Sequence, residues 1–197
     1  MAGNRKATGL NVHTVQEATN LISQRKVIRV TPTLSTSTYA DGDVLFILTE
    51  IPNAVLVPGG CSALTHMWVA DYKDVSDTDA ILLFTEKNTT TIGAINETAN
   101  IEVADLKANN LIGWASWDQS AANTSSDIDD MRFHRVMSAS GASEPHTPLM
   151  ILQAAAGSTS VYVGGILNSA TTPGYDADSI ELIFHICLLY TSDAADD

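Results

Sequence analysis

The sequence has few cysteines, few basic residues and no long hydrophobic run. Cys61 and Cys187 are its two cysteines, too few and too far apart for a disulfide framework or for a zinc site with four clustered ligands. No apolar stretch reaches the roughly 18 residues that a membrane-spanning helix needs. Lys and Arg number 10 against 23 Asp and Glu, which gives a formal net charge of -13. Nucleic acid and anionic lipid both require cations from a protein, so we expect no direct nucleic-acid partner and no membrane partner.

What the sequence has instead is a series of short apolar and β-branched runs separated by clusters of Gly, Pro, Asn, Asp and Ser. Polar and apolar residues alternate in the first run and in the last, which is typical of strands with one buried face and one exposed face. Helix is indicated only at residues 14–23 and 101–109, both near the minimum length for a stable helix. The expected strands are residues 27–34, 43–48, 63–71, 80–85, 111–117, 131–138, 149–154, 160–166 and 179–186.

This pattern predicts an all-β protein, an antiparallel β-sandwich of jelly-roll or immunoglobulin-like topology with an extended N-terminal arm. The strands at 149–154 and 160–166 are expected to pair as a hairpin. We divide the chain into the arm, residues 1–26, and one sandwich domain, residues 27–186. The arm is polar, carries four cations and does not have the pattern of a secretory signal. Residues 187–197 resemble the translation of a sequencing-library adapter that was read through before the true stop codon.

The loop after the third expected strand contains four alternating carboxylates that are candidate calcium ligands: Asp71, Asp74, Asp77 and Asp79. The loop lacks the central Gly and the terminal Glu of an EF-hand, so a solvated turn between strands is the alternative interpretation. The same two interpretations apply to the acidic segment 127–130.

Three tryptophans, Trp68, Trp114 and Trp117, are the candidates for a surface that stacks against sugars, and core packing is the alternative. Because Trp114 and Trp117 are three residues apart, a regular strand directs them to opposite faces. The five histidines do not have metal-ligand spacing, and no nucleophile elbow or acid pair is present. We therefore expect no enzyme activity, no cofactor and no metal beyond the weak calcium candidates.

The order of several segments resembles a family of small virion structural proteins from environmental tailed bacteriophages. The residues that carry the resemblance are VTPTL (30–34), YADGDVLF (39–46), EIPNAV (50–55), IG (112–113), LQAAAGSTSVYV (152–163) and IEL (180–182). The polar insert at residues 118–130 departs from the family pattern.

The resemblance implies a non-enzymatic capsid decoration protein or head-associated assembly component, located in the virion and assembled in the host cytoplasm. Its implied partners are further copies of itself, the major capsid protein or other virion proteins. The alternative function is a carbohydrate-binding module of a phage tail or fibre, which the tryptophans and acidic loops suggest.

Overall fold

Alternating side chains bury one face of each long strand. In β3 (Cys61–Asp71), Leu64, Met67 and Val69 are fully buried, whereas the intervening Trp68 is partly exposed. The computed structural model describes residues 25–76, 78–119, 125–138 and 150–189. The other elements are β1 (Arg25–Val30), β2 (Val44–Ile51), β4 (Ala80–Thr85), α2 (Val103–Ala108), β5 (Leu111–Trp117), β6 (Ser125–Ile128), β7 (Met131–Arg135), β8 (Met137–Ser138), β9 (Met150–Gln153), β10 (Val161–Leu167) and β11 (Ile180–Leu188).

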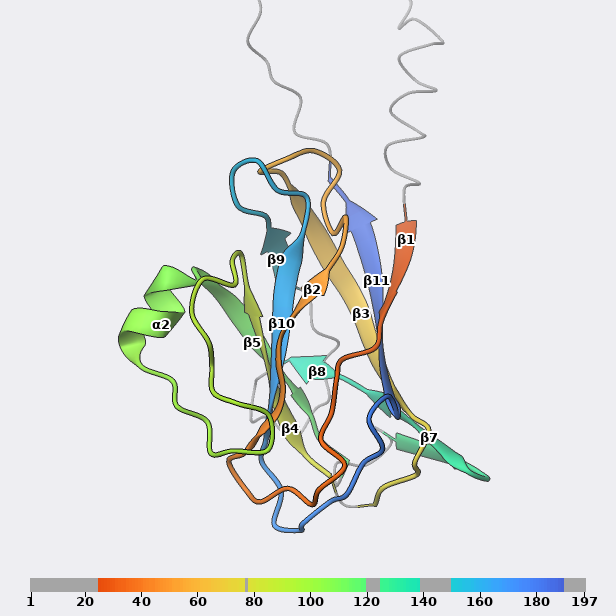
Figure 1. Cartoon of the computed structure of the whole chain (residues 1–197). Coiled ribbons are helices and arrows are strands. Elements are labelled where there is room, and N and C mark those ends of the chain that lie inside the picture. The colour runs from red at the N-terminus through yellow and green to blue at the C-terminus, as the bar shows by residue number, and fades with distance from the viewer. Residues whose placement is uncertain (1–24, 77, 120–124, 139–149, 190–197) are drawn as a thin grey trace, which may run out of the picture.

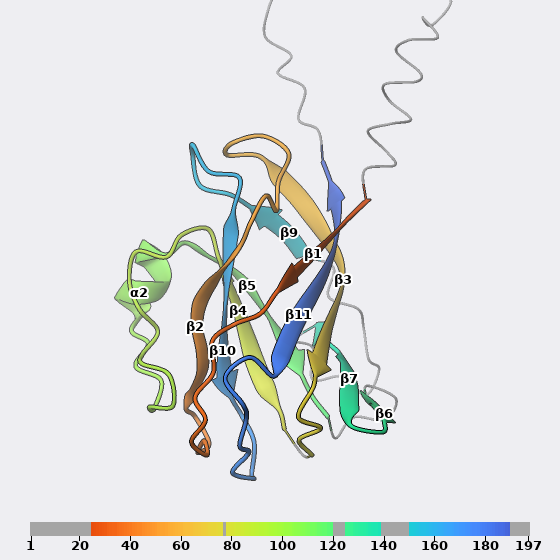
Figure 2. The ribbon, with the colours of Figure 1, turned by 45° about the vertical axis from the view of Figure 1, so that its right-hand side comes forward.

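The strands form two antiparallel sheets that face each other (Figures 1 and 2). Sheet I has the order β1-β11-β3-β7-β6, and β9 pairs with the same edge of β3 as β7 does. Sheet II has the order β2-β10-β4-β5-β8. Most connections cross from one sheet to the other, while β4-β5 and β6-β7 are pairs of consecutive strands within one sheet. The predicted all-β sandwich is confirmed.

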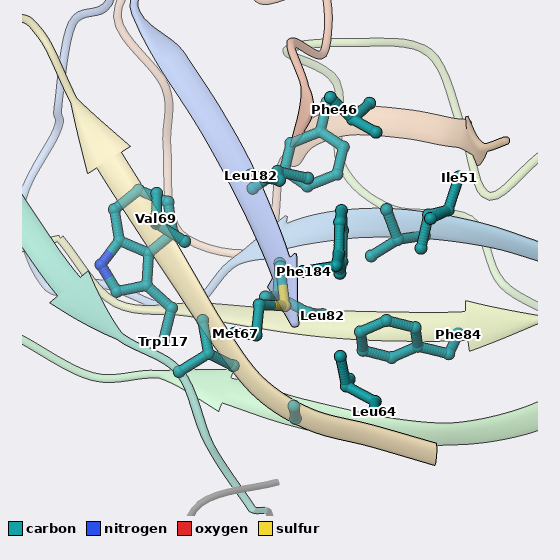
Figure 3. Packing of buried hydrophobic residues seen from close by; sticks show 14 of the residues in the cluster. Phe46, Ile51, Leu64, Met67, Val69, Leu82, Phe84, Trp117, Leu182 and Phe184 are labelled. Atoms are coloured by element: carbon teal, nitrogen blue, oxygen red, sulfur yellow. The ribbon is translucent and has the colours of Figure 1, made fainter. Parts of the chain in front are cut away.

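The core lies between the sheets and is formed by apolar residues from both (Figure 3). Trp117 of β5 packs beside Val69 and Met67 of β3, and Phe84 of β4 meets Phe184 of β11 edge to face at a centroid distance of 6.4 Å. A second, smaller cluster of Val44, Leu48 and Ile92 joins β2 to the long segment between β4 and β5. This segment and α2 therefore lie against sheet II (Figure 1), and the outer face of sheet I has no such cover among the described residues.

Two glycines are required by the geometry of the fold. Gly42 has a φ of +82° in the turn that leads into β2, a conformation that other residues rarely adopt. Gly165 of β10 lies so close to Phe46 of the neighbouring strand that a Cβ atom at this position would collide with the ring. A side chain here would displace Phe46 from the core.

Eight of the nine expected strands correspond to single observed strands, and β4 and β5 have the predicted bounds. The expected strand at 131–138 is instead two short strands, β7 in sheet I and β8 in sheet II. The predicted helix at 101–109 is α2, which has six residues and is too short to cross a bilayer; no other helix in the described part of the chain is long and apolar enough to do so. The other predicted helix, at 14–23, lies outside the described residues. β6 falls in the polar insert, where the sequence did not indicate a strand.

The predicted hairpin between residues 149–154 and 160–166 is wrong. β9 pairs with β3 in sheet I, whereas β10 pairs with β2 and β4 in sheet II. The connection is too long for a two-residue turn, and its backbone bonds to the loop before β3, where Ala154 N–H donates to Gly60 O at 3.1 Å. The two strands thus lie in opposite sheets, and their apolar faces meet the core from its two sides.

The strand boundaries differ slightly from the expected domain limits. β1 begins at Arg25, two residues inside the segment assigned to the N-terminal arm. β11 continues past Ile186, because Cys187 pairs with Ala63 and Leu188 with Ser62. Residues 1–24 of the arm and residues 190–197 of the expected adapter tail lie outside the described residues.

Candidate functional site

The carboxylates of the acidic loop are engaged in holding the loop itself. Asp71 is fully buried at the end of β3, and its two oxygens accept the backbone N–H groups of Lys73 at 2.8 Å and Val75 at 2.9 Å. Asp74 forms an ion pair with Arg132 of β7 at 2.8 Å. Asp79 accepts the backbone N–H of Gln119 at 2.8 Å. These contacts fasten the loop to β7 and to the end of β5.

The calcium candidates therefore do not converge on one point. The described residues contain no group of three or more His, Cys, Asp or Glu side chains placed to hold a metal ion. Asp77, the fourth candidate, lies outside the described residues. Burial raises the pKa of Asp71, and its two backbone hydrogen bonds oppose that rise. Asp71, Asp74 and Asp79 thus have a structural role in the loop.

The three tryptophans do not form one surface. Trp117 is fully buried in the core, and Trp114 is 45% exposed on the outer face of sheet II, so the predicted opposite orientation is confirmed. Trp68 lies on β3, with its side chain on the outer face of sheet I. The sandwich therefore separates Trp68 from Trp114, and a stacking platform built from all three is wrong.

A group of buried polar side chains lies at the acidic-loop end of the core. The rings of His134 and Trp117 are 4.9 Å apart, and among the described residues neither ring nitrogen of His134 nor the indole nitrogen has a hydrogen-bond partner. Burial, together with repulsion from Arg132, lowers the pKa of His134 to about 4. The nearby phenol of Tyr175 has its pKa raised by burial. His134 is therefore a neutral core residue at physiological pH.

The outer face of sheet I carries an apolar surface with arginines beside it. We call Val27, Trp68, Phe133 and Ile151 the sheet I patch; they lie on β1, β3, β7 and β9. Val27 is 51% and Ile151 54% exposed, while Trp68 and Phe133 are partly exposed. In the row that crosses the sheet at Trp68, the partners are Arg29, Ile183, Trp68 and Arg135.

A groove at one end of this face gathers cationic and hydrogen-bonding side chains. It has a volume of about 350 Å³ and is lined by β1, β3 and β11. Arg25 and Lys26 contribute from β1, and His66 and His185 face each other from the neighbouring strands with ring centroids 6.3 Å apart. The sequence had indicated that Arg25 and Lys26 belong to a basic segment. It did not indicate that two distant histidines would lie next to each other beside that segment.

The fold and its surfaces define an all-β sandwich protein in which no described site has a recognisable catalytic arrangement. Comparison with known proteins adds no family to this description: no protein-family model, curated protein or solved structure matches the chain.

Proposed function

We propose that the chain is a non-enzymatic structural protein of a bacteriophage virion, a capsid decoration protein or head-associated component that acts through contacts with other virion subunits. The observation that carries this proposal is the sheet I patch. Aromatic residues and arginine are enriched in protein interfaces, and exposed apolar groups gathered on one face are typical of contact surfaces. The patch and the arginines beside it combine both features on a two-sheet support.

The strand order also supports a virion protein. If the eight principal strands β1, β2, β3, β4, β5, β9, β10 and β11 are numbered along the chain, their orders in the two sheets are 1-8-3-6 and 2-7-4-5. We infer a jelly-roll topology from this order, because an immunoglobulin-like domain pairs its early strands with one another. Viral capsid proteins commonly use the jelly roll. Lectins use it as well, so the topology supports the proposal without deciding it.

The second candidate function is carbohydrate binding, which Trp114 favours. Its indole is exposed on sheet II, with Leu83 opposite it on β4. A single exposed tryptophan can stack on a sugar ring, but the other two tryptophans cannot contribute to the same site. A glycan array on which wild-type protein binds and Trp114→Ala does not would support this function, and the absence of any bound glycan would contradict it.

The virion proposal is tested by assembly and by gene context. We expect light scattering after size exclusion to give a mass above that of the monomer, and the double variant V27E/I151E to lower it. The matched variant V103E/L111E, which replaces two exposed apolar residues elsewhere, should leave the mass unchanged. A portal, major capsid or tail gene should lie next to the gene for this chain. A monomeric protein encoded within a metabolic operon would contradict the proposal.

A further inference from the structure

We propose that the free edge of β1 and the adjoining groove bind an extended acidic segment of a partner protein, which adds to sheet I as a further strand. The inference rests on the proposed function in one respect, namely that the partner is another protein of the same assembly. It names a binding site and a partner chemistry that the sheet I patch alone does not define.

The first observation is the position of β1 in the sheet. β1 pairs with β11 over its whole length, from Arg25 opposite Cys187 to Val30 opposite Leu182. It is the last strand of sheet I, and it pairs with no second strand in the described part of the chain. The comparable edge of sheet II is partly closed, because Val44 of β2 bonds to Glu97 and Asn96 of the long segment between β4 and β5. β1 therefore has backbone donors and acceptors available for strand addition.

The second observation is the charge of β1 in an acidic protein. Arg25, Lys26 and Arg29 all lie on this six-residue strand, while the whole chain has a formal net charge of -13. Arg25 and Lys26 have no ion pair with a described carboxylate; the Lys26 ammonium group donates to the backbone oxygen of Asn53 at 3.1 Å. Arg29 pairs with Glu181 of β11 at 2.6 Å, and its guanidinium has further N–H donors for a second carboxylate. The edge is thus basic mainly at its Arg25 and Lys26 end, where it is complementary to a negatively charged segment.

Strand geometry specifies where the partner's acidic residues must lie. Arg25, Val27 and Arg29 alternate with the inward-facing Ile28 and Val30, so their side chains project from the outer face of the sheet. Residues of an added antiparallel strand lie directly opposite them on the same face. The best-matched segment therefore has an acidic residue, an apolar residue and a second acidic residue at every second position.

A second copy of β1 is a poor partner. In the antiparallel register centred on Val27, Arg25 of one copy faces Arg29 of the other, twice. Like charges directly opposite each other destabilise a strand pair. Charge therefore favours a different, acidic chain over self-pairing at this edge.

The groove gives the partner segment a second contact. It begins at Arg25, Lys26 and Val27 and extends over β11 to β3, where His66, His185 and Thr65 line it. The Thr65 hydroxyl already donates to the backbone oxygen of His185 at 2.9 Å, whereas the imidazoles of His66 and His185 can donate hydrogen bonds to a carboxylate that lies over the groove. A segment that continues past the added strand can thus place a further acidic residue there.

The test is a titration of the isotope-labelled full chain with synthetic peptides, followed by backbone amide chemical shifts. The probe peptide alternates threonine with Glu, Val and Glu, so that the two glutamates are four residues apart and share a face. One control peptide has lysine in place of both glutamates, and another has the glutamates three residues apart, which directs them to opposite faces. We expect shifts confined to β1, β11 and the groove. Binding of the probe should be about fivefold tighter than binding of either control.

Two charge variants test whether the probe binds at this edge or is attracted to cations anywhere on the protein. R25Q/R29Q should weaken binding of the probe about fivefold, whereas K87Q/K107Q, which removes the same charge elsewhere, should not. Both variants must keep the wild-type melting temperature. Because the C-terminal tail carries three aspartates, the titration is repeated with D193N/D196N/D197N. Tighter binding of the probe to that variant would identify the tail as a competitor for the same edge.

Failure of this inference can be distinguished from failure of the virion function. No binding, equal binding of the two glutamate spacings, or shifts spread over sheet II would overturn strand addition at β1 whatever the oligomeric state is. Specific binding of the probe by a protein that remains monomeric and lies in a metabolic operon would support the acidic-segment site and contradict the virion function.

Discussion

Replacing His134 by phenylalanine should remove a large part of the pH dependence of stability between pH 7.5 and pH 5. His134 is fully buried against Trp117, and its pKa is lowered by burial from 6.5 to about 4. A phenyl ring has a similar volume and has no nitrogen that needs a partner, so the variant should fold at neutral pH.

The expected magnitude follows from proton linkage. The unfolded chain takes up the His134 proton near pH 6.5 and the folded chain only near pH 4, so acidification favours unfolding. The contribution of this residue to stability is complete above pH 6.5 and is lost as the pH falls toward 4. At pH 5 the wild-type protein should have lost about 2 kcal/mol of its free energy of unfolding through His134. This pH also lies above the isoelectric point near 4.5, where solubility is lowest.

The assay is urea unfolding followed by tryptophan fluorescence at both pH values. Asp71 acts in the opposite direction, because its raised pKa makes protonation favour the folded state, but it is common to both proteins and cancels in their comparison. We expect the loss of stability between pH 7.5 and pH 5 to be about 2 kcal/mol smaller in the variant. Equal losses in the two proteins would refute a buried, unpartnered imidazole at this position.

Three further results are expected. Trp117→Ala should lower the free energy of unfolding by about 3–5 kcal/mol in urea, whereas Trp114→Ala should change it by less than about 0.5 kcal/mol, because only the first indole is in the core; similar effects would contradict the assignment of faces. Gly165→Val should cost about 1–3 kcal/mol by forcing Phe46 out of place, and unchanged stability would mean that the strands can separate without cost. Millimolar calcium should move the melting temperature by less than about 1 °C, since Asp71 is already bonded within its loop, and a larger rise would restore the calcium site.

The sequence was sufficient to predict the strands because alternation is a local property. In β11, buried Phe184 and Ile186 flank the partly exposed His185, and buried Ile180 and Leu182 flank the partly exposed Glu181. This period of two is visible without knowledge of the partner strands. β4 and β5 were placed with correct bounds because turn residues flank both. The predicted orientation of Trp114 and Trp117 required only their spacing of three.

Strand pairing could not be predicted from the same pattern. β9 and β10 each alternate correctly, but alternation says only that each strand has an inner face, not which sheet it joins. β9 pairs with β3, whose two ends accept β9 and β7 along one edge, whereas β10 pairs with β2 and β4 in the other sheet. β6 was missed because its residues, SSDI, are polar and exposed, and it forms only by pairing with β7.

The candidate site was predicted only in part for the same reason. The acidic loop could be found from its sequence, but the partners of Asp74 and Asp79 come from residues 132 and 119, far along the chain. The groove depends on His66 and His185, which are adjacent only because β3 pairs with β11 in that register. Sites made by contacts between distant strands leave little signal in a single sequence.

The central claim is that this sandwich acts by contact through the outer face of sheet I. Its most direct test is the mass of the wild-type protein and of V27E/I151E, measured by light scattering over a range of concentrations. We expect a wild-type assembly that falls to the monomer in this variant, with V103E/L111E remaining assembled. A wild-type protein that is monomeric at every concentration and does not sediment with the capsids encoded beside it would contradict the claim.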